Sequence, residues 1–571
     1  MTSRELSDIL SEMETLLILH GENEFKATAY NRASRALSMT QIDIQQAVEN
    51  ATLLLIPGIG KSIAGEIADI VISGESVQLN NLLKKTPSGI LDILKIRGLG
   101  AKKVKTLWNE LQIESIGELE YACMENRIST LKGFGIKSQN KILEGLNDLK
   151  NNSGKLRLDA ATVISELLLE NFLKIQGVIQ CSIAGSVRRG AEEVDSLIFV
   201  IECENISNFI ENLSKLENVT DVQSNLNSSH FILDNDVKVK IRFAEKGNFY
   251  GVLHGYTGAS DYYFMISIPL KDHGFDLKDD GIYQDNLLIK INSEEEIFSK
   301  AKMQFIIPEL REGIEEVRFA IDNKIPEKFI TLDDIQGMFH VHSNWSDGEN
   351  SLDEIANHCV KNNWKYILLC DHSKAAFYAN GLNEKRLLEQ SKAIDEINKR
   401  YDPSVFKMLK GIECDILSEG RMDFDDDVLA SLDSVVGSIH SIFNLSKEAQ
   451  TDRLCNALEN KYVTILGHPT GRLILSRKGY DIDFQTVIDT AAKNNKSIEL
   501  NASPYRLDMN WRMIKYARKK GVKIAINTDA HSIKGYDVLR YGITMGRKGW
   551  LTKNDILNSM TKEEFLKFAK K

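Results

Sequence analysis

The stretch MFHVHSNWSDG at residues 338–348 decides the fold of the C-terminal part of the chain. Apolar residues alternate with histidines, so His340 and His342 share one face of a strand, and polar residues with a glycine follow it. Similar apolar runs recur downstream, separated by stretches of helical periodicity, and this β-α alternation predicts a parallel α/β barrel. The predicted strands are 337–342, 366–370, 408–413, 434–440, 463–468, 497–501 and 523–528.

Residues of the metal-ligand type stand at the ends of nearly all these strands, where the active sites of β/α barrels form. A single histidine in such a place is more often structural than a ligand, but six at strand ends are improbable by chance. Imidazole and carboxylate ligands without a thiolate favour Mn²⁺, Zn²⁺ or Fe, and Mg²⁺ less. The candidate metal ligands are His340, His342, Asp347, His372, Glu413, His440, His468, Asp529 and His531.

In this order along the chain, H-x-H…SDG, CDHS, GIECDI, SIHS, GHPTG and NTDAH resemble the motif set of the PHP (polymerase and histidinol phosphatase) family. The resemblance covers residues 335–571 and implies hydrolysis of phosphoesters by three divalent metal ions. The ligand sets that it implies are His340, His342, Glu413 and Asp529 for one ion, Glu413, His440 and His468 for another, and Asp347, His372 and His531 for the third.

Four residues of this region are predicted to be catalytic: Glu413, His440, Asp529 and Arg472. In the sets that the resemblance implies, Glu413 bridges two ions. Arg472, in GHPTGRL, is predicted to clamp a phosphate because a guanidinium group matches two phosphate oxygens. The alternative for Arg472 is an ordinary surface arginine. Asp371, just before His372, either orients a ligand or caps a turn.

An internal repeat marks residues 1–150, with IPGIGKSIAGEI at 56–67, IRGLGAKKVKTL at 96–107 and LKGFGIKSQNKI at 131–142. Each G-x-G opens an amphipathic helix, and these segments resemble helix-hairpin-helix modules. Backbone N–H groups at such turns bind phosphates without reading a base sequence. The alternative is a packing turn with solvated lysines. The predicted DNA-binding residues are Gly58, Gly60, Lys61, Gly98, Gly100, Lys102, Lys103, Gly133, Gly135 and Lys137.

Between these regions, AGSVRRGAEE at 184–193, YTGAS at 256–260 and IPELREG at 307–313 resemble landmarks of X-family DNA polymerases. With the hairpins and the PHP motifs, the whole chain resembles the bacterial PolX family, which joins both modules. The palm of that family carries three catalytic carboxylates, and the matching positions here are Ser196, Ile198 and Lys240. A lysine repels the cations that nucleotidyl transfer needs, so we expect no DNA polymerase activity.

The expected fold class is multidomain: helical hairpin domains, an α+β polymerase-β-like palm and thumb, and a distorted (β/α)7 PHP barrel. The predicted parts are a helical domain with the first hairpin at 1–85, a fingers-like helical domain with the other two at 86–150, a degenerate palm at 151–243, a thumb at 244–318, a linker at 319–335 and the PHP domain at 336–571.

Composition and charge limit the other properties. The chain of 571 residues is too long for one hydrophobic core. It has no apolar run long enough to span a membrane, and its N-terminus has the pattern of an amphipathic helix, so we expect a cytoplasmic protein. The net charge of −10 gives no global case for DNA binding, so contacts with DNA must be local.

These patterns predict a Mn²⁺- or Zn²⁺-dependent DNA 3′–5′ exonuclease of DNA repair, with an inactive polymerase region that contacts the DNA backbone. One alternative is a PHP phosphatase for a small phosphomonoester, which leaves the hairpins unexplained. Another is a DNA-binding scaffold with a structural metal site, which leaves the full ligand set and Arg472 unexplained.

Overall fold

The computed structural model describes residues 2–38, 44–96, 98–150, 154–216, 218–233 and 236–570. The chain divides into two compact units, Met1–Leu149 and Lys150–Lys571. The finer domain boundaries inferred from the sequence stay predictions. Among the described residues, no helix is both long and apolar enough to cross a membrane.

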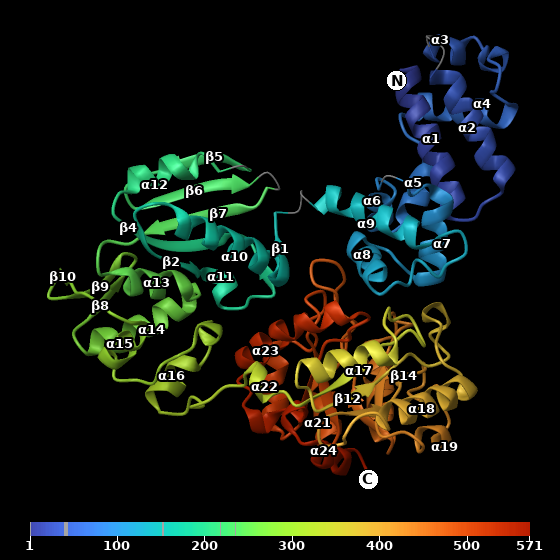
Figure 1. Cartoon of the computed structure of the whole chain (residues 1–571). Coiled ribbons are helices and arrows are strands. Elements are labelled where there is room, and N and C mark those ends of the chain that lie inside the picture. The colour runs from blue at the N-terminus through green and yellow to red at the C-terminus, as the bar shows by residue number, and fades with distance from the viewer. Residues whose placement is uncertain are drawn as a thin grey trace. The chain divides into compact units, whose positions relative to one another are not determined.

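The described residues of the first unit form helices joined by turns, drawn in blue and cyan in Figure 1. Apolar residues three or four positions apart give each long helix one buried stripe, as Leu6, Leu10, Met13 and Leu17 do in the first helix. The helices are α1 Ser3–Leu19, α2 Glu24–Ser38, α3 Ile44–Glu49, α4 Lys61–Ser73, α5 Val77–Lys85, α6 Ser88–Ile93, α7 Ala101–Leu111, α8 Ile116–Met124 and α9 Ile136–Lys150.

Three turns of this unit depend on glycine. Gly58, Gly98 and Gly133 have φ angles of 104°, 93° and 90°, a conformation that residues with a Cβ atom rarely adopt. Helices α4, α7 and α9 each begin three residues after these glycines, as the repeat in the sequence predicts.

The second unit begins with a five-stranded mixed sheet in the order β2-β4-β7-β6-β5, in which β4 and β7 are parallel. Alternate residues of β4 and β7, such as Phe199 and Ile241, bury one face against two helices through Phe172 and Phe209. The elements are β1 Leu156–Arg157, α10 Leu158–Lys174, β2 Val178–Ala184, α11 Gly185–Arg188, β3 Glu193–Val194, β4 Leu197–Cys203, α12 Ile206–Leu213, β5 Val219–Ser224, β6 Ser228–Leu233 and β7 Lys238–Phe243.

A smaller α+β segment follows and packs around Tyr262, Ile266 and Phe298. Its helices are α13 Phe249–Thr257, α14 Ser260–Asp272, α15 Glu294–Lys300 and α16 Glu316–Ile321, and its strands are β8 Asp276–Lys278, β9 Gly281–Gln284 and β10 Leu287–Leu288.

A buried carboxylate joins this segment to the sheet. Glu294 lies 2.5 Å from a guanidinium nitrogen of Arg311, which is fully buried, and 2.5 Å from one of Arg188. Burial raises the pKa of the Glu294 carboxyl, but the nearby His254 ring, 3.7 Å away, and the two arginine charges outweigh burial. The pKa therefore lies well below its ordinary range.

The rest of the second unit is a parallel β barrel with helices outside it. Its two sheets run β11-β12-β13 and β14-β15-β16-β17-β18. Parallel bridges close both seams, from Val341 to Ala530 and from His372 to Glu413. The strands are β11 Gly337–Val341, β12 Tyr366–Leu369, β13 Lys407–Lys410, β14 Glu413–Asp415, β15 Val435–Ser438, β16 Val463–Leu466, β17 Ser497–Asn501 and β18 Ile524–Asn527.

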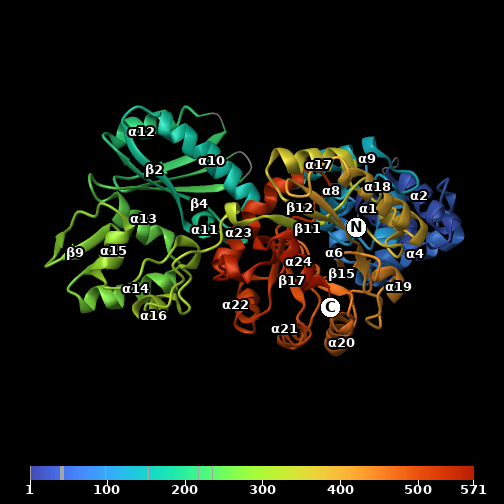
Figure 2. The same ribbon diagram turned by 60° about the horizontal axis from the view of Figure 1, so that its bottom comes forward.

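Helices lie outside these strands. Figure 2 shows α20, α21 and α22 side by side on the outer side of β15 and β17. Each helix buries an apolar stripe on the barrel, such as Val487, Ile488 and Ala491 of α21. The helices are α17 Leu352–Lys361, α18 Glu384–Asn398, α19 Asp426–Leu429, α20 Lys447–Glu459, α21 Phe484–Lys493, α22 Trp511–Lys519, α23 Leu539–Lys548 and α24 Lys562–Ala569.

The prediction of one strand at 408–413 is wrong, because this stretch is split between β13 and β14 in different sheets. A Cβ atom on Gly411 would lie 2.7 Å from the carbonyl oxygen of Leu369, so the backbone crosses β12 closely at this point. After the break, Glu413 pairs with Val436 of β15 and also bridges to His372, just beyond the end of β12.

Replacing Glu294 with glutamine should destabilise the second unit by about 3–5 kcal/mol at neutral pH, because buried guanidinium groups lose their carboxylate. Since folding lowers the pKa of Glu294, its stabilising effect is complete above the unfolded-state pKa of about 4.3 and declines as pH falls below it. Calorimetric melting of wild type and Glu294→Gln should therefore converge in acid. Glu295→Gln, at an exposed neighbour, is the control, and equal melting temperatures of Glu294→Gln and wild type at neutral pH would contradict the prediction.

Candidate metal centre

Glu413 lies where most of the ligand-type side chains converge, and it is completely buried. Its Oε1 atom lies 3.2 Å from Nε2 of His340, 3.2 Å from Nε2 of His440 and 3.0 Å from Nε2 of His468. Its Oε2 atom lies 2.8 Å from Nδ1 of His372. The two oxygens thus face different histidines, a geometry in which one carboxylate can bridge two cations.

Three groups of ligand-type residues overlap at this end of the barrel, each with one atom per residue within 4.8 Å of the others. They are His340, His342, Glu413 and Asp529; His342, Asp347, His372 and His531; and His372, Glu413 and His440. The first group coincides with a set that the PHP resemblance implies. The others differ from the implied sets, since His342 joins the second group and His372 stands in the third in place of His468.

The nitrogen and oxygen atoms of the centre are arranged as ligands of divalent cations rather than as hydrogen-bond partners of one another. Nε2 of His340, Oδ2 of Asp347 and Oε2 of Glu413 are buried and make no hydrogen bond. Each nevertheless lies within 3.6 Å of another ligand-type atom. Buried polar atoms without a partner are costly, so shared cations account for this arrangement better than direct contacts do. Which ion each group holds stays a prediction.

The carboxylates of the centre are held as anions, the form that binds cations. Burial raises the pKa of Glu413, but the charges of His440, His340 and His372 outweigh burial and hold that pKa well below its ordinary range. Burial acts in the same direction on Asp347, whose pKa is lowered by the nearby His531 and His372.

Sequence reasoning missed the carboxylates that orient the histidines. Glu499 is buried in β17 and lies 2.7 Å from Nδ1 of His340, and its other oxygen accepts a hydrogen bond from the backbone N–H of His468 at 3.1 Å. Asp415 lies 3.2 Å from Nδ1 of His440. Such contacts fix the ring orientation of a ligand histidine. The available signal was an acidic residue in the middle of the predicted strand SIELN at 497–501, a place where an unpaired charge is unfavourable.

The carboxylate of Asp371 binds the loop after β11 and not the ring of a ligand histidine. Its carboxylate accepts hydrogen bonds from the backbone N–H of Ser343 at 2.8 Å and from the hydroxyl of Ser346 at 2.5 Å. That loop carries Asp347, so Asp371 supports this ligand through the backbone.

Arg472 lies beside the centre with its guanidinium group engaged by another part of the unit. Nη2 and Nη1 donate to the two carboxylate oxygens of Glu192 at 2.7 and 3.2 Å. Nε donates to the carbonyl oxygen of Arg506 at 2.9 Å. Its role as a phosphate clamp stays a prediction.

The mixed sheet carries no carboxylates at the positions where the polymerase resemblance expects them. Ile198 on β4 pairs in register with Lys240 on β7, and Ser196 directly precedes β4. The nearby Asp195 is exposed and lies 3.6 Å from Nζ of Lys155. In the described part of residues 154–335, no three His, Cys, Asp or Glu side chains converge as metal ligands.

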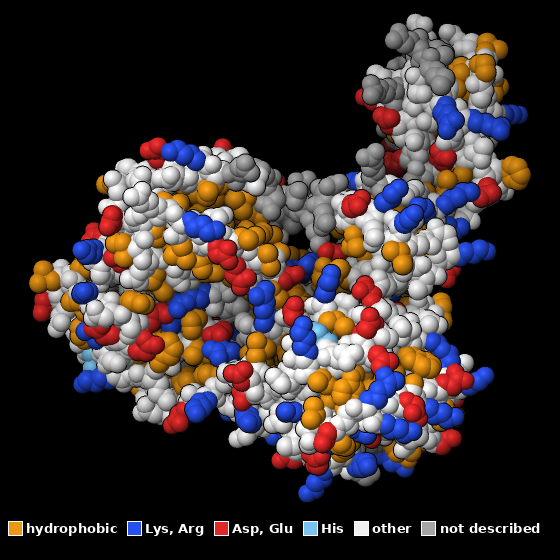
Figure 3. Space-filling view, in the orientation of Figure 1, with side chains coloured by type: hydrophobic (Ala, Val, Ile, Leu, Met, Phe, Trp, Pro, Cys, Tyr) orange, Lys and Arg blue, Asp and Glu red, His pale blue; other side chains and the backbone are white. Residues whose placement is uncertain are grey.

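The hairpin glycines leave space for an approaching ligand. An added Cβ atom would meet nothing within 4 Å at Gly60, Gly98, Gly100, Gly133 or Gly135, whereas Gly58 packs on the Arg32 carbonyl oxygen. Lys61, Lys102 and Lys137 are exposed beside these turns. The side chain of Lys103 is half-buried, with its ammonium group exposed. Arg97 lies outside the described residues. Figure 3 shows basic side chains over the visible face of this unit, interspersed with acidic ones.

Family models match four segments of the chain. They are a helix-hairpin-helix domain at 1–76, a SAM-like helix-hairpin-helix tandem at 90–148, a DNA polymerase beta thumb at 252–312 and a PHP domain at 339–503. The DNA polymerase/3′-5′ exonuclease PolX of Bacillus subtilis (strain 168) is 35% identical over 572 residues, which cover 99% of each chain. The chain belongs to the PolX family.

Other relatives share a smaller part with this PolX family member. A probable phosphatase of Thermoanaerobacter sp. (strain X514) is 32% identical over 27% of this chain and 64% of its own. A probable phosphatase of Caldicellulosiruptor saccharolyticus is 27% identical over 39% of this chain and 90% of its own. The expected multidomain fold class, with helical hairpins, a polymerase-β-like region and a PHP domain, is confirmed.

Replacing Glu413 with glutamine should lower kcat at least ~100-fold and release metal, because an amide keeps the volume but cannot supply two anionic oxygens to neighbouring cations. Metal content by mass spectrometry and hydrolysis of a phosphodiester should fall together. Glu419→Gln is the control, since its side chain is 74% exposed. Full metal content in Glu413→Gln with more than about a tenth of wild-type kcat would exclude a bridging role.

Proposed function

We propose that this PolX family member is a metal-dependent DNA 3′–5′ exonuclease of DNA repair. Its PHP domain supplies the chemistry and the remainder of the chain holds DNA without extending it. The observation that carries this proposal is the convergence of nine ligand-type side chains, Glu413 among them, at the end of a parallel barrel, in a chain with three glycine hairpins.

The residues of the centre bind and orient rather than react covalently. Glu413 presents its two oxygens to separate histidines, and His440 and Asp529 belong with Arg472 to the proposed catalytic set. These side chains and the other ligand-type residues would hold three Mn²⁺ or Zn²⁺ ions, which would supply a bound water of lowered pKa and positive charge toward the phosphodiester. Glu499 and Asp415 fix the rings of His340 and His440, so the ligand atoms keep their direction.

We assign DNA binding to the hairpins. At each hairpin a helix N-terminus follows an open glycine turn, so backbone N–H groups can donate to phosphate oxygens of any base sequence. Lys61, Lys103 and Lys137 add positive charge nearby. Because these contacts are electrostatic, the affinity for DNA should fall steeply with salt.

The proposal includes the loss of DNA synthesis, an activity that the name of the Bacillus subtilis relative includes. Ser196, Ile198 and Lys240 supply no carboxylate, and the ammonium group of Lys240 opposes cation binding on that face. Tyr262 and Tyr263 stand where the X-family resemblance places a His-Asn pair. Tyr262 is buried in the core of the α+β segment, and the hydroxyl of Tyr263 donates to the Leu277 carbonyl oxygen at 3.2 Å, so both side chains make contacts inside that segment.

A small-phosphomonoester phosphatase is the second candidate. The observation in its favour is the match of part of this chain to proteins described as probable phosphatases. The hairpins have no role in that reaction, so we rank it second.

The full-length protein with Mn²⁺ should shorten a 5′-labelled oligonucleotide stepwise from its 3′ end, and it should release phosphate from a panel of small phosphomonoesters far more slowly. Gel electrophoresis of the labelled DNA measures the first activity and phosphate release the second. Rapid monoester hydrolysis with intact DNA would reverse the ranking of the two candidates.

On a gapped duplex with nucleotides and Mg²⁺ or Mn²⁺, the protein should not extend the primer, because the described residues of its palm form no carboxylate cluster to hold the cations. Glu413→Gln removes interfering degradation from this assay. The Bacillus subtilis relative, run in parallel, is the positive control. Primer extension by Glu413→Gln above a buffer control would show that other residues had replaced the missing carboxylates.

A further inference from the structure

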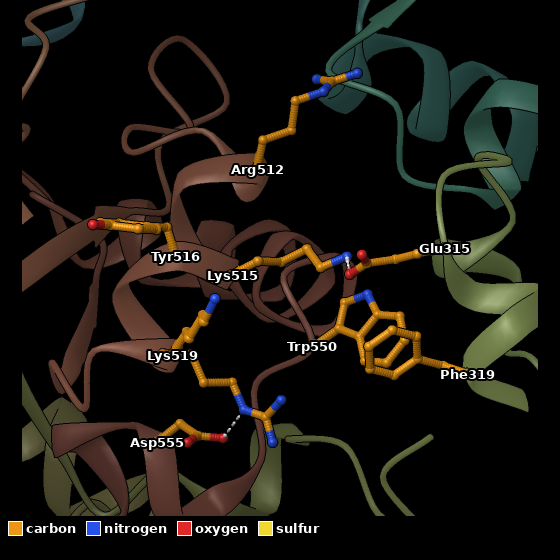
Figure 4. A pocket seen from close by; sticks show the side chains of 9 residues that line it. Glu315, Phe319, Arg512, Lys515, Tyr516, Lys519, Trp550 and Asp555 are labelled. Atoms are coloured by element: carbon orange, nitrogen blue, oxygen red, sulfur yellow. Dashed lines mark hydrogen bonds and ion pairs between the residues drawn. The ribbon is translucent and has the colours of Figure 1, made fainter. Parts of the chain in front are cut away.

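Among the described residues, four carboxylates of the polymerase-like region lie within 2.7 Å of a cationic nitrogen of the PHP barrel, closer than Glu166 lies to Arg540 at 3.5 Å. Arg547 Nε lies 2.6 Å from Glu309, Lys515 Nζ lies 2.5 Å from Glu315, and Lys548 binds Glu312. Figure 4 shows Lys515 and Glu315 directed toward one another beside Trp550, in a cavity of about 610 Å³ on the outside of the barrel. The fourth carboxylate is Glu192, which belongs to AGSVRRGAEE and pairs with Arg472.

Glu192 differs from the other three because its partner holds a loop of the metal centre. Four N–H groups of Arg472 donate hydrogen bonds: two to Glu192 and one each to the carbonyl oxygens of Arg506 and Leu507. Glu192 also accepts from the side-chain amide of Asn510 at 3.5 Å. The loop 503–510 is therefore held at several points by Glu192 and by the arginine that Glu192 orients.

The other side of this loop reaches the predicted ligand Asp529. Arg506 Nε lies 3.8 Å from Oδ2 of Asp529. The carbonyl oxygen of Asp508 accepts the backbone N–H of Asn501 at 2.5 Å, and the Asn501 side chain donates to the same oxygen of Asp529 at 3.0 Å. Two short chains of contacts thus lead from Glu192 to one carboxylate of the centre.

The loop also reaches the strand end that carries His468. The carboxylate of Asp508 accepts the backbone N–H of Thr470 at 2.9 Å, two residues beyond that histidine. A displacement of the loop would therefore move both Asp529 and the strand end that carries His468.

We infer that Glu192 is a positioning residue for the metal centre: it holds Arg472 and loop 503–510 so that Asp529 and His468 keep their places. The inference rests on the proposed phosphodiesterase function. Under this inference, Arg472 binds Glu192 instead of a phosphate. The polymerase-like region then supports the hydrolytic site, although we propose that it performs no synthesis.

The test compares full-length wild type with Glu192→Gln and Glu315→Gln. Each variant removes one ion pair between the same two regions, but only Glu192 connects to the loop at the centre. The substrate is bis(4-nitrophenyl) phosphate, which needs no hairpin contact. Calorimetric Mn²⁺ binding and melting temperature are measured beside kcat and KM.

Glu192→Gln should lower kcat and weaken Mn²⁺ binding by about tenfold, the scale typical of residues that orient metal ligands, with KM changed by less than about twofold. Glu315→Gln should match wild type in kcat and Mn²⁺ affinity. Glu192→Asp, which retains a carboxylate, should recover part of the loss. A general loosening of the interface would instead affect both glutamine variants alike.

Unchanged kcat and Mn²⁺ affinity in Glu192→Gln, or equal losses in both glutamine variants, would overturn the inference. If wild type hydrolyses neither DNA nor the diester, the proposed function fails by itself. The Mn²⁺ titrations then decide alone, with weaker binding in Glu192→Gln than in Glu315→Gln supporting the positioning role and equal binding refuting it.

Discussion

A carboxylate buried completely among imidazole rings is the constraint on which the C-terminal half of this protein depends. Burying such a carboxylate costs free energy unless opposite charges surround it. Here Glu413 has histidines from several strands within 3.6 Å. Further buried carboxylates, such as Glu499 and Asp529, add negative charge to the same end of the barrel. Bound cations would relieve this excess, so metal binding and folding stability should be coupled in this domain.

Parts of this centre could be predicted from sequence because they follow from local geometry. Residues two apart on a strand share a face, which brings His340 and His342 together, and the C-terminal ends of parallel strands meet at one edge. Glu499 could not be assigned in the same way. It lies inside a strand rather than at its end, and its contact with His340 spans 159 residues of sequence.

The strand break before Glu413 was also beyond sequence reasoning. An apolar run with one glycine is consistent with an unbroken strand, and only the close crossing of Gly411 over β12 shows why the chain changes sheets there. In contrast, the glycine hairpins were predictable, because a left-handed φ followed by a helix leaves a repeated pattern of residue types. The pairing of Arg472 with Glu192 spans 280 residues and leaves no local pattern.

The burial of Lys548 has a consequence for which substitutions this chain tolerates. Its side chain is 2% exposed, and its ammonium group contacts Glu312 together with the backbone carbonyl oxygens of Arg189 and Glu309. Replacing Glu312 leaves the Lys548 ammonium group without its counter-charge inside the molecule. Substitutions on the exposed part of the mixed sheet, where Lys240 lies, leave these contacts intact, whereas substitutions at the junction with the barrel break them. Deletion of the polymerase-like region would expose that junction, so we expect the region and the barrel to unfold as one cooperative unit.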